Sequence, residues 1–70
     1  MDGIKKNNIL EIFDFVIKIE ETGNKFYLQM ASIVKEEHLQ EFFKDMAEEE
    51  VLHGCKFKEM KKKYLMTRNQ

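Results

Sequence analysis

The chain has 70 residues with one cysteine, no proline and a net charge of −1, so we expect a single domain, 1–70, without a disulfide framework or a four-cysteine metal site. The near-neutral charge does not support a nucleic-acid partner, and no apolar run reaches the roughly 18 to 20 residues of a membrane span. Because the lone cysteine suits a reducing compartment and residues 1–8 are too polar for a signal sequence, we expect a soluble, cytoplasmic protein that binds neither nucleic acid nor membrane.

The first predicted element is an amphipathic helix over about residues 8–35. Its apolar residues recur at three- and four-residue spacing along one seam, and a second apolar seam runs beside the first. The first seam contains Leu10, Phe13, Ile17, Tyr27, Ala31 and Val34, and the second contains Ile9, Ile12, Val16, Ile19, Gly23, Phe26, Met30 and Ile33. Together they make a stripe wider than one partner helix can cover, so we expect this helix to have two neighbours.

The second predicted element is a helix over about residues 38–65, because the apolar pattern stops after Val34 and resumes out of phase. The shifted seam contains Leu39, Phe43, Met46, Phe57, Met60 and Tyr64. We interpret the polar run Lys35–His38 as a turn, although it holds neither glycine nor proline and one continuous helix is the alternative. The predicted fold is all-α, an antiparallel two-helix hairpin that forms a four-helix bundle by dimerisation. The partner is thus a second copy, in a homodimer or a larger even-numbered homo-oligomer.

Three residues with metal-binding side chains occupy inward positions of these seams: Glu20 in the first helix, and Glu50 and His53 in the second. A buried, unpaired carboxylate normally protonates, pairs or binds a metal. All three residues lie roughly 24 Å from the predicted turn, and the i, i+3 spacing places Glu50 and His53 on one helix face. Two copies would supply the ligand set of a di-iron helix bundle, so these three residues are the predicted metal ligands and catalytic residues. The alternative is a plain hairpin whose glutamates reach water, with His53 an ordinary core histidine.

Nearby residues are weaker candidates. Glu49 could accept the imidazole N–H of His53, or it is a solvated surface acid. Tyr27 could hydrogen-bond a ligand carboxylate, or it belongs to the apolar core. Gly23 and Gly54 lie inside the predicted helices, where each costs roughly 1 kcal/mol relative to alanine, and close helix packing or room for a ligand would explain them.

Two segments resemble the rubrerythrin branch of the ferritin-like superfamily. They are Ile19–Tyr27, with a glutamate six residues before an aromatic pair, and Met46–His53, with a Glu-x-x-His sequence. The resemblance covers roughly residues 9–60, and it implies iron bound by the first glutamate and by the Glu-x-x-His pair. The thirty-residue step from Glu20 to Glu50 is also similar to that of the encapsulated ferritins, which are half-bundles with di-iron sites between chains.

This family resemblance implies a di-iron carboxylate protein that oxidises Fe(II) with dioxygen or peroxide, either a ferroxidase or a peroxide-reducing oxidoreductase. Iron is the expected cofactor, and manganese or zinc are possible substitutes. A full rubrerythrin has two helix pairs and a cysteine-rich electron-transfer domain, whereas this chain has one pair and one cysteine, so we expect an external reductant. The alternative function is a non-catalytic metal-binding or purely structural helical dimerisation module.

Overall fold

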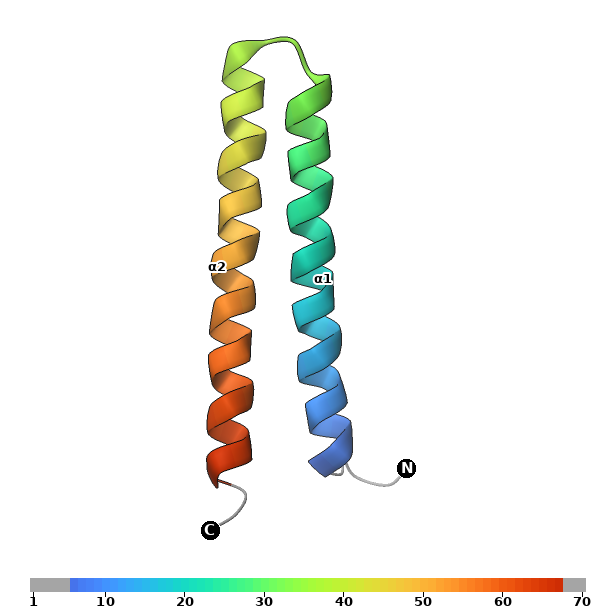
Figure 1. Ribbon diagram of the computed structural model, residues 1–70, viewed down its shortest axis with the longest axis vertical. Coiled ribbons are helices and arrows are strands. Elements are labelled where there is room, and N and C mark those ends of the chain that lie inside the picture. Colours follow the sequence, from blue (N-terminus) through green and yellow to red (C-terminus); the bar gives the residue numbers. More distant parts are fainter. Residues whose placement is uncertain (1–5, 68–70) are drawn as a thin grey trace.

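The computed structural model describes residues 6–67; residues 1–5 and 68–70 of the expected domain lie outside this range. The described chain forms two helices, α1 (Lys6–Ile33) and α2 (Glu37–Thr67), which run antiparallel to each other (Figure 1). The predicted all-α, two-helix hairpin is therefore confirmed, and a single continuous helix is excluded. Neither of these helices has an apolar stretch long enough to cross a membrane.

The turn is shorter than the sequence indicated. We predicted it over Lys35–His38, whereas the residues between the two helices are Val34–Glu36. Glu37 and His38 therefore belong to the first turn of α2. An acidic residue at the start of a helix interacts favourably with the helix macrodipole, which is why Glu37 supports a helix start and not a turn.

Hydrogen bonds at the turn close both helix ends without the help of glycine or proline. The Glu36 carbonyl accepts the backbone N–H groups of Leu39 and Gln40 at 3.1 and 3.0 Å. The Gln40 side chain donates to the Val34 carbonyl at 2.9 Å. Because these contacts satisfy groups that a helix end leaves unpaired, the turn needs no left-handed residue, and no described residue has a positive φ.

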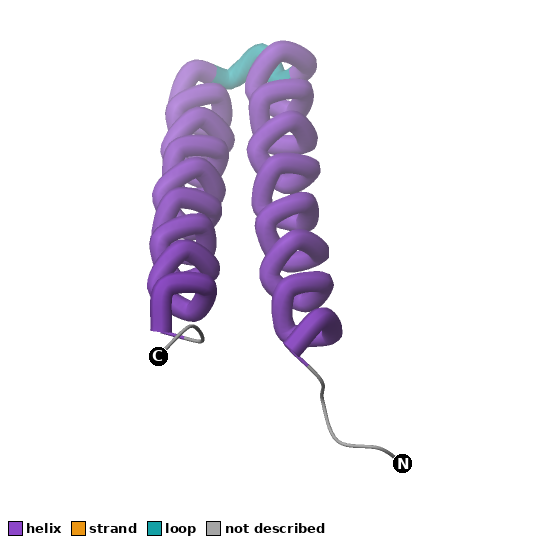
Figure 2. The backbone as a smooth tube through the Cα atoms, turned by 60° about the horizontal axis from the view of Figure 1, so that its bottom comes forward, coloured by secondary structure: helices purple, strands orange, loops and turns teal. Residues whose placement is uncertain are grey.

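The hairpin is only one helix thick. Its extents are 52 × 25 × 12 Å, and a helix with its side chains is about 10–12 Å across. Figure 2 shows the same two rods from a second direction, with no further layer on either broad face. Among the described residues, Ala31 and Ala47 are the only buried hydrophobic ones. A single hairpin therefore lacks a core of large side chains.

Aromatic contacts join the helices on either side of their midpoint. Tyr27 stacks on Phe43 near the turn, and Phe13 meets Tyr64 nearer the open end, each with ring centroids 6.3 Å apart. Such pairs stabilise by more than their buried area alone. They leave the middle of the interhelical seam to polar side chains.

The two flanks of the hairpin differ in character. Ion pairs between the helices mark one flank, which we call the charged edge: Lys58–Glu21 at 3.7 Å and Lys61–Asp14. Residues two positions apart on a helix are rotated by about 200°. Ile19, two residues before Glu21, and Met60, two residues after Lys58, therefore face the opposite flank.

Seven of the twelve large, exposed apolar side chains within residues 6–67 lie on that opposite flank. On α1 they recur at helical spacing, and on α2 two of them are five full turns apart. We call this surface the apolar face and define it by Ile12, Phe15, Ile19, Phe26, Ile33, Phe42 and Met60. Four of these belong to the second predicted seam, so the hairpin leaves uncovered the part of the stripe that was expected to need another neighbour.

Candidate metal centre

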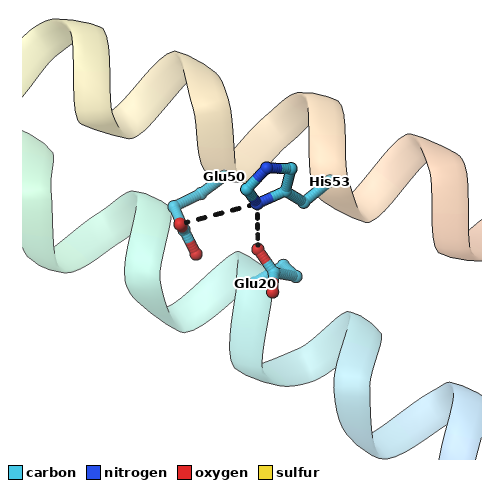
Figure 3. A group of neighbouring side chains, drawn as sticks. All are labelled: Glu20, Glu50 and His53. Atoms are coloured by element: carbon cyan, nitrogen blue, oxygen red, sulfur yellow. Dashed lines mark ion pairs between the residues drawn. The ribbon is translucent and has the colours of Figure 1, made fainter.

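The middle of the hairpin brings together Glu20 from α1 and Glu50 and His53 from α2 (Figure 3). Each side chain offers one ligand atom, and these atoms all lie within 4.8 Å of one another. Nδ1 of His53 is 3.4 Å from Oε2 of Glu20 and 3.9 Å from Oε1 of Glu50. The structure thus places the three predicted ligands in one cluster, and metal binding by them stays a prediction.

Local helix geometry and one interhelical hydrogen bond position this cluster. Glu50 and His53 are three residues apart, so they lie on the same face of α2. Nδ2 of Asn24 donates to the Ala47 carbonyl at 2.9 Å. Asn24 lies about one turn from Glu20 and Ala47 lies about one turn from Glu50. The bond therefore holds the two helices in the register at which the carboxylates meet.

The carboxylates are largely withdrawn from water. The side chains of Glu20 and Glu50 are 15% and 18% exposed, whereas that of His53 is 51% exposed. Oε2 of Glu20 is buried, and within residues 6–67 it has no hydrogen-bond partner. A buried carboxylate oxygen that accepts no hydrogen bond is unfavourable, and a cation beside it would remove that penalty. The donor set of oxygen and imidazole nitrogen fits iron or manganese.

The pKa of Glu50 is raised above its ordinary value. The main cause is a side-chain hydrogen bond with Glu20, which requires a proton on Glu50, and burial and the charge of Glu20 act in the same direction. A charged His53 opposes the shift. Without metal, the site therefore holds a proton more readily than a solvated glutamate does, and a bound cation would displace it.

This shift predicts how the stability of the metal-free protein depends on pH. The pKa of Glu50 is higher in the folded than in the unfolded protein, so the stabilisation that this carboxyl group provides is complete below the unfolded pKa. It is lost as pH rises through the folded pKa. We therefore expect the unfolding free energy of the wild type to fall between these two pKa values, relative to that of Glu50→Gln. Urea unfolding of both proteins with chelator, from about pH 4 to about pH 8, measures this difference. A difference that is constant with pH would contradict the expectation.

The site is reached differently from the two flanks. A groove of about 420 Å³ opens on the charged edge, where Glu21, Lys25 and Lys58 line it, and the carboxylates of Glu20 and Glu50 also line it. On the other flank lies a second hollow, which is lined by Glu20, His53, Lys56, Phe57 and Met60. The imidazole thus lies on the side of the apolar face, and the carboxylates are also accessible from the charged edge.

The two weaker candidates lie outside the cluster of ligand atoms. The Tyr27 ring packs against Phe43 and, at 5.5 Å, against Phe26. Glu49 is exposed, and its negative charge adds to the raised pKa of Glu50. No hydrogen bond is found between either residue and the three clustered side chains within residues 6–67.

The ion pairs of the charged edge were not predicted from the sequence. The two acidic residues, Asp14 and Glu21, are seven residues apart on α1, and the two lysines, Lys58 and Lys61, are three residues apart on α2. The sequence did contain a signal for these ion pairs, because acidic residues of the first helix and basic residues of the second lie at similar distances from the turn. Without a known flank for each helix, however, the pattern could not be distinguished from ordinary solvated charge.

Comparison with known proteins gives one match. A family model described as Rubrerythrin matches residues 11–69, which is most of the chain. The searches of curated proteins and of solved structures each gave no match. The resemblance to the rubrerythrin branch, which the segments around Glu20 and His53 carried, is therefore confirmed.

Proposed function

This chain belongs to the rubrerythrin family, and on that premise we propose that it is a di-iron carboxylate protein that oxidises Fe(II) with dioxygen or peroxide at a centre shared by two copies. The observation that carries the proposal is the cluster of Glu20, Glu50 and His53 between two helices. The buried Oε2 of Glu20, which has no hydrogen-bond partner among the described residues, supports it further, because a cation would satisfy that atom.

A second copy is required by the number of ligands. One hairpin supplies two carboxylates and one imidazole, which is too few for a pair of metal ions. Ferritin-like di-iron bundles use a glutamate from each of two helices and a Glu-x-x-His pair from each of the other two. Two copies of this hairpin contain that set, with Glu20 as the single glutamate and Glu50 with His53 as the pair.

The apolar face is the surface on which we place the second copy. Ile19 and Met60 are exposed there, and His53 borders the hollow that Met60 lines. Docking on this face would cover the imidazole and the apolar side chains together, and it would bring the two half-sites next to each other. The charged edge, with its ion pairs and its groove, would stay open to water.

The residues of the cluster have distinct parts in this proposal. Glu20 and Glu50 would neutralise the positive charge of bound iron, and His53 would complete a mixed oxygen and nitrogen shell. A cation at the site would favour the charged form of Glu50 and so would oppose the raised pKa that the hydrogen bond with Glu20 and burial cause. When bound, a pair of iron ions supplies two electrons, enough to reduce dioxygen to peroxide or peroxide to water.

Fe(II)-dependent oxygen uptake tests the activity. Protein reconstituted anaerobically should consume dioxygen, or added peroxide, faster than Fe(II) alone in the same buffer. Replacing His53 with alanine should lower this rate by about 100-fold or more, because it removes a nitrogen ligand from each half-site. The matched control is His38→Ala, since His38 is exposed in the first turn of α2.

The same assay separates the proposed oxidase from a module that only binds metal or dimerises. Metal uptake without consumption of an oxidant would indicate a metal-binding module. Equal rates for wild type and His53→Ala would contradict the assignment of the site.

A further inference from the structure

Two glycines lie beside the candidate metal centre: Gly23 in α1, next to the Glu50 side chain, and Gly54 in α2, next to that of Glu20. Neither Gly23 nor Gly54 has a positive φ, so backbone freedom does not explain them. Glycine is a poorer helix former than alanine. Space for a neighbouring side chain is the remaining explanation, and the structure supports it at only one of the two positions.

At Gly23 the space is taken by the Glu50 carboxylate. A Cβ atom built there would lie 2.7 Å from Oε2, 3.2 Å from Cδ and 3.4 Å from Cγ of Glu50. The first distance is shorter than any normal contact between a carbon and an oxygen. A Cβ at Gly54 would have as its nearest neighbour the Glu20 Cβ at 3.7 Å, which is an ordinary van der Waals contact.

The group that would have to move is the end of a flexible side chain. All three nearest atoms to a Cβ at Gly23 belong to Glu50, and none is backbone. The helices themselves are held by the hydrogen bond from Asn24 to the Ala47 carbonyl, one residue away from Gly23 along α1. An added methyl group would therefore displace the carboxylate and leave the helix pair in place.

We propose that Gly23 is a positioning residue of the metal centre: the absence of a side chain there creates the space in which the Glu50 carboxylate lies against α1, beside Glu20. This inference rests on the proposed metal site. It gives the glycine a role that close helix packing alone does not explain, because Gly54 is the more buried of the two and yet has room for a methyl group.

Gly23→Ala and Gly54→Ala form a matched pair for the test. Both substitutions exchange a helical glycine for the best helix former, and only the first meets Glu50. We would titrate wild type and both variants with Co(II), whose visible absorption reports its coordination, and record the helical content of each metal-free protein by circular dichroism. We expect Gly23→Ala to fold, to bind Co(II) about 10- to 100-fold more weakly than wild type, and to show an altered spectrum. Gly54→Ala should match the wild type.

The outcomes separate this inference from the proposed function. Equal Co(II) affinity and spectra in all three proteins would overturn the role of Gly23 and leave the metal site standing. Equal weakening in both variants would also overturn it, because the cause would then be helix packing. Failure of the wild type to bind Co(II) would overturn the proposed metal site and this inference together.

A second measurement does not depend on metal or on a variant. In the metal-free wild type, nuclear Overhauser contacts between the Glu50 γ-protons and the Gly23 α-protons should be present, because the end of the Glu50 side chain lies against Gly23. Their absence from an assigned spectrum would overturn the inference.

Discussion

Replacing Ile19 with lysine is expected to dissociate the assembly and to lower its helical content. Ile19 is 48% exposed in the single hairpin and lies in the middle of the apolar face. A symmetric interface contains the residue twice. Because each copy of Ile19 has about half of its side chain left to bury, loss of this burial alone weakens the dimer by about 1.5–3 kcal/mol, which is about 10- to 100-fold in the dissociation constant. A buried, unpaired lysine adds to this loss. Sedimentation and circular dichroism at micromolar concentration measure both effects.

Leu28→Lys is the control for this substitution. Leu28 is 50% exposed, so its exposure is close to that of Ile19, but it follows Glu21 by two helical turns and belongs to the charged edge. We expect this variant to keep the oligomeric state and helical content of the wild type. A compact, helical monomer of the wild type, or equal effects of the two lysines, would contradict docking on the apolar face.

Replacing Glu20 with alanine is expected to separate metal binding from the stability of the metal-free fold. The substitution removes a buried oxygen without a hydrogen-bond partner and a negative charge beside Glu50. The stability of the metal-free protein should therefore stay the same or rise. Stabilisation by bound metal, about 2.7 kcal/mol per site at a hundredfold excess over the dissociation constant, should disappear. Anaerobic thermal melts with and without Fe(II) measure both quantities.

Glu21→Ala is the matched control for Glu20→Ala. Glu21 is the adjacent residue, but it is exposed and its partner is Lys58 on the surface. Loss of such an ion pair changes stability by about 0–1 kcal/mol, and the shift caused by metal should be retained. Equal metal-induced shifts in wild type and Glu20→Ala would defeat the assignment of Glu20 as a ligand.

The hairpin could be predicted because its signals are periodic. The phase slip after Val34 marks a break that a continuous helix could not accommodate, and the double seam on α1 indicates a helix with more than one neighbour. The turn was placed too late because a polar run is equally compatible with a turn and with the first turn of a helix. Only the hydrogen bonds of Glu36 and Gln40 distinguish the two.

The residues of the candidate site could be selected from the sequence, but the arrangement of their side chains could not. Inward positions and i, i+3 spacing are properties of one chain and one helix, so Glu20, Glu50 and His53 could be selected from the sequence. The role of Gly23 could not be predicted, because it depends on where the Glu50 side chain lies against α1. Which flank carries the imidazole depends likewise on the relative rotation of the two helices, and a periodic pattern leaves that rotation open.

Native mass spectrometry of protein reconstituted anaerobically with Fe(II) tests the shared centre most directly. We expect the wild type to appear as a dimer, or a larger even-numbered assembly, that carries about two iron ions per pair of chains. Glu20→Ala should appear as the same assembly without iron. A wild-type monomer that carries iron, a wild-type assembly that carries none, or a Glu20→Ala assembly that keeps its iron would contradict the account.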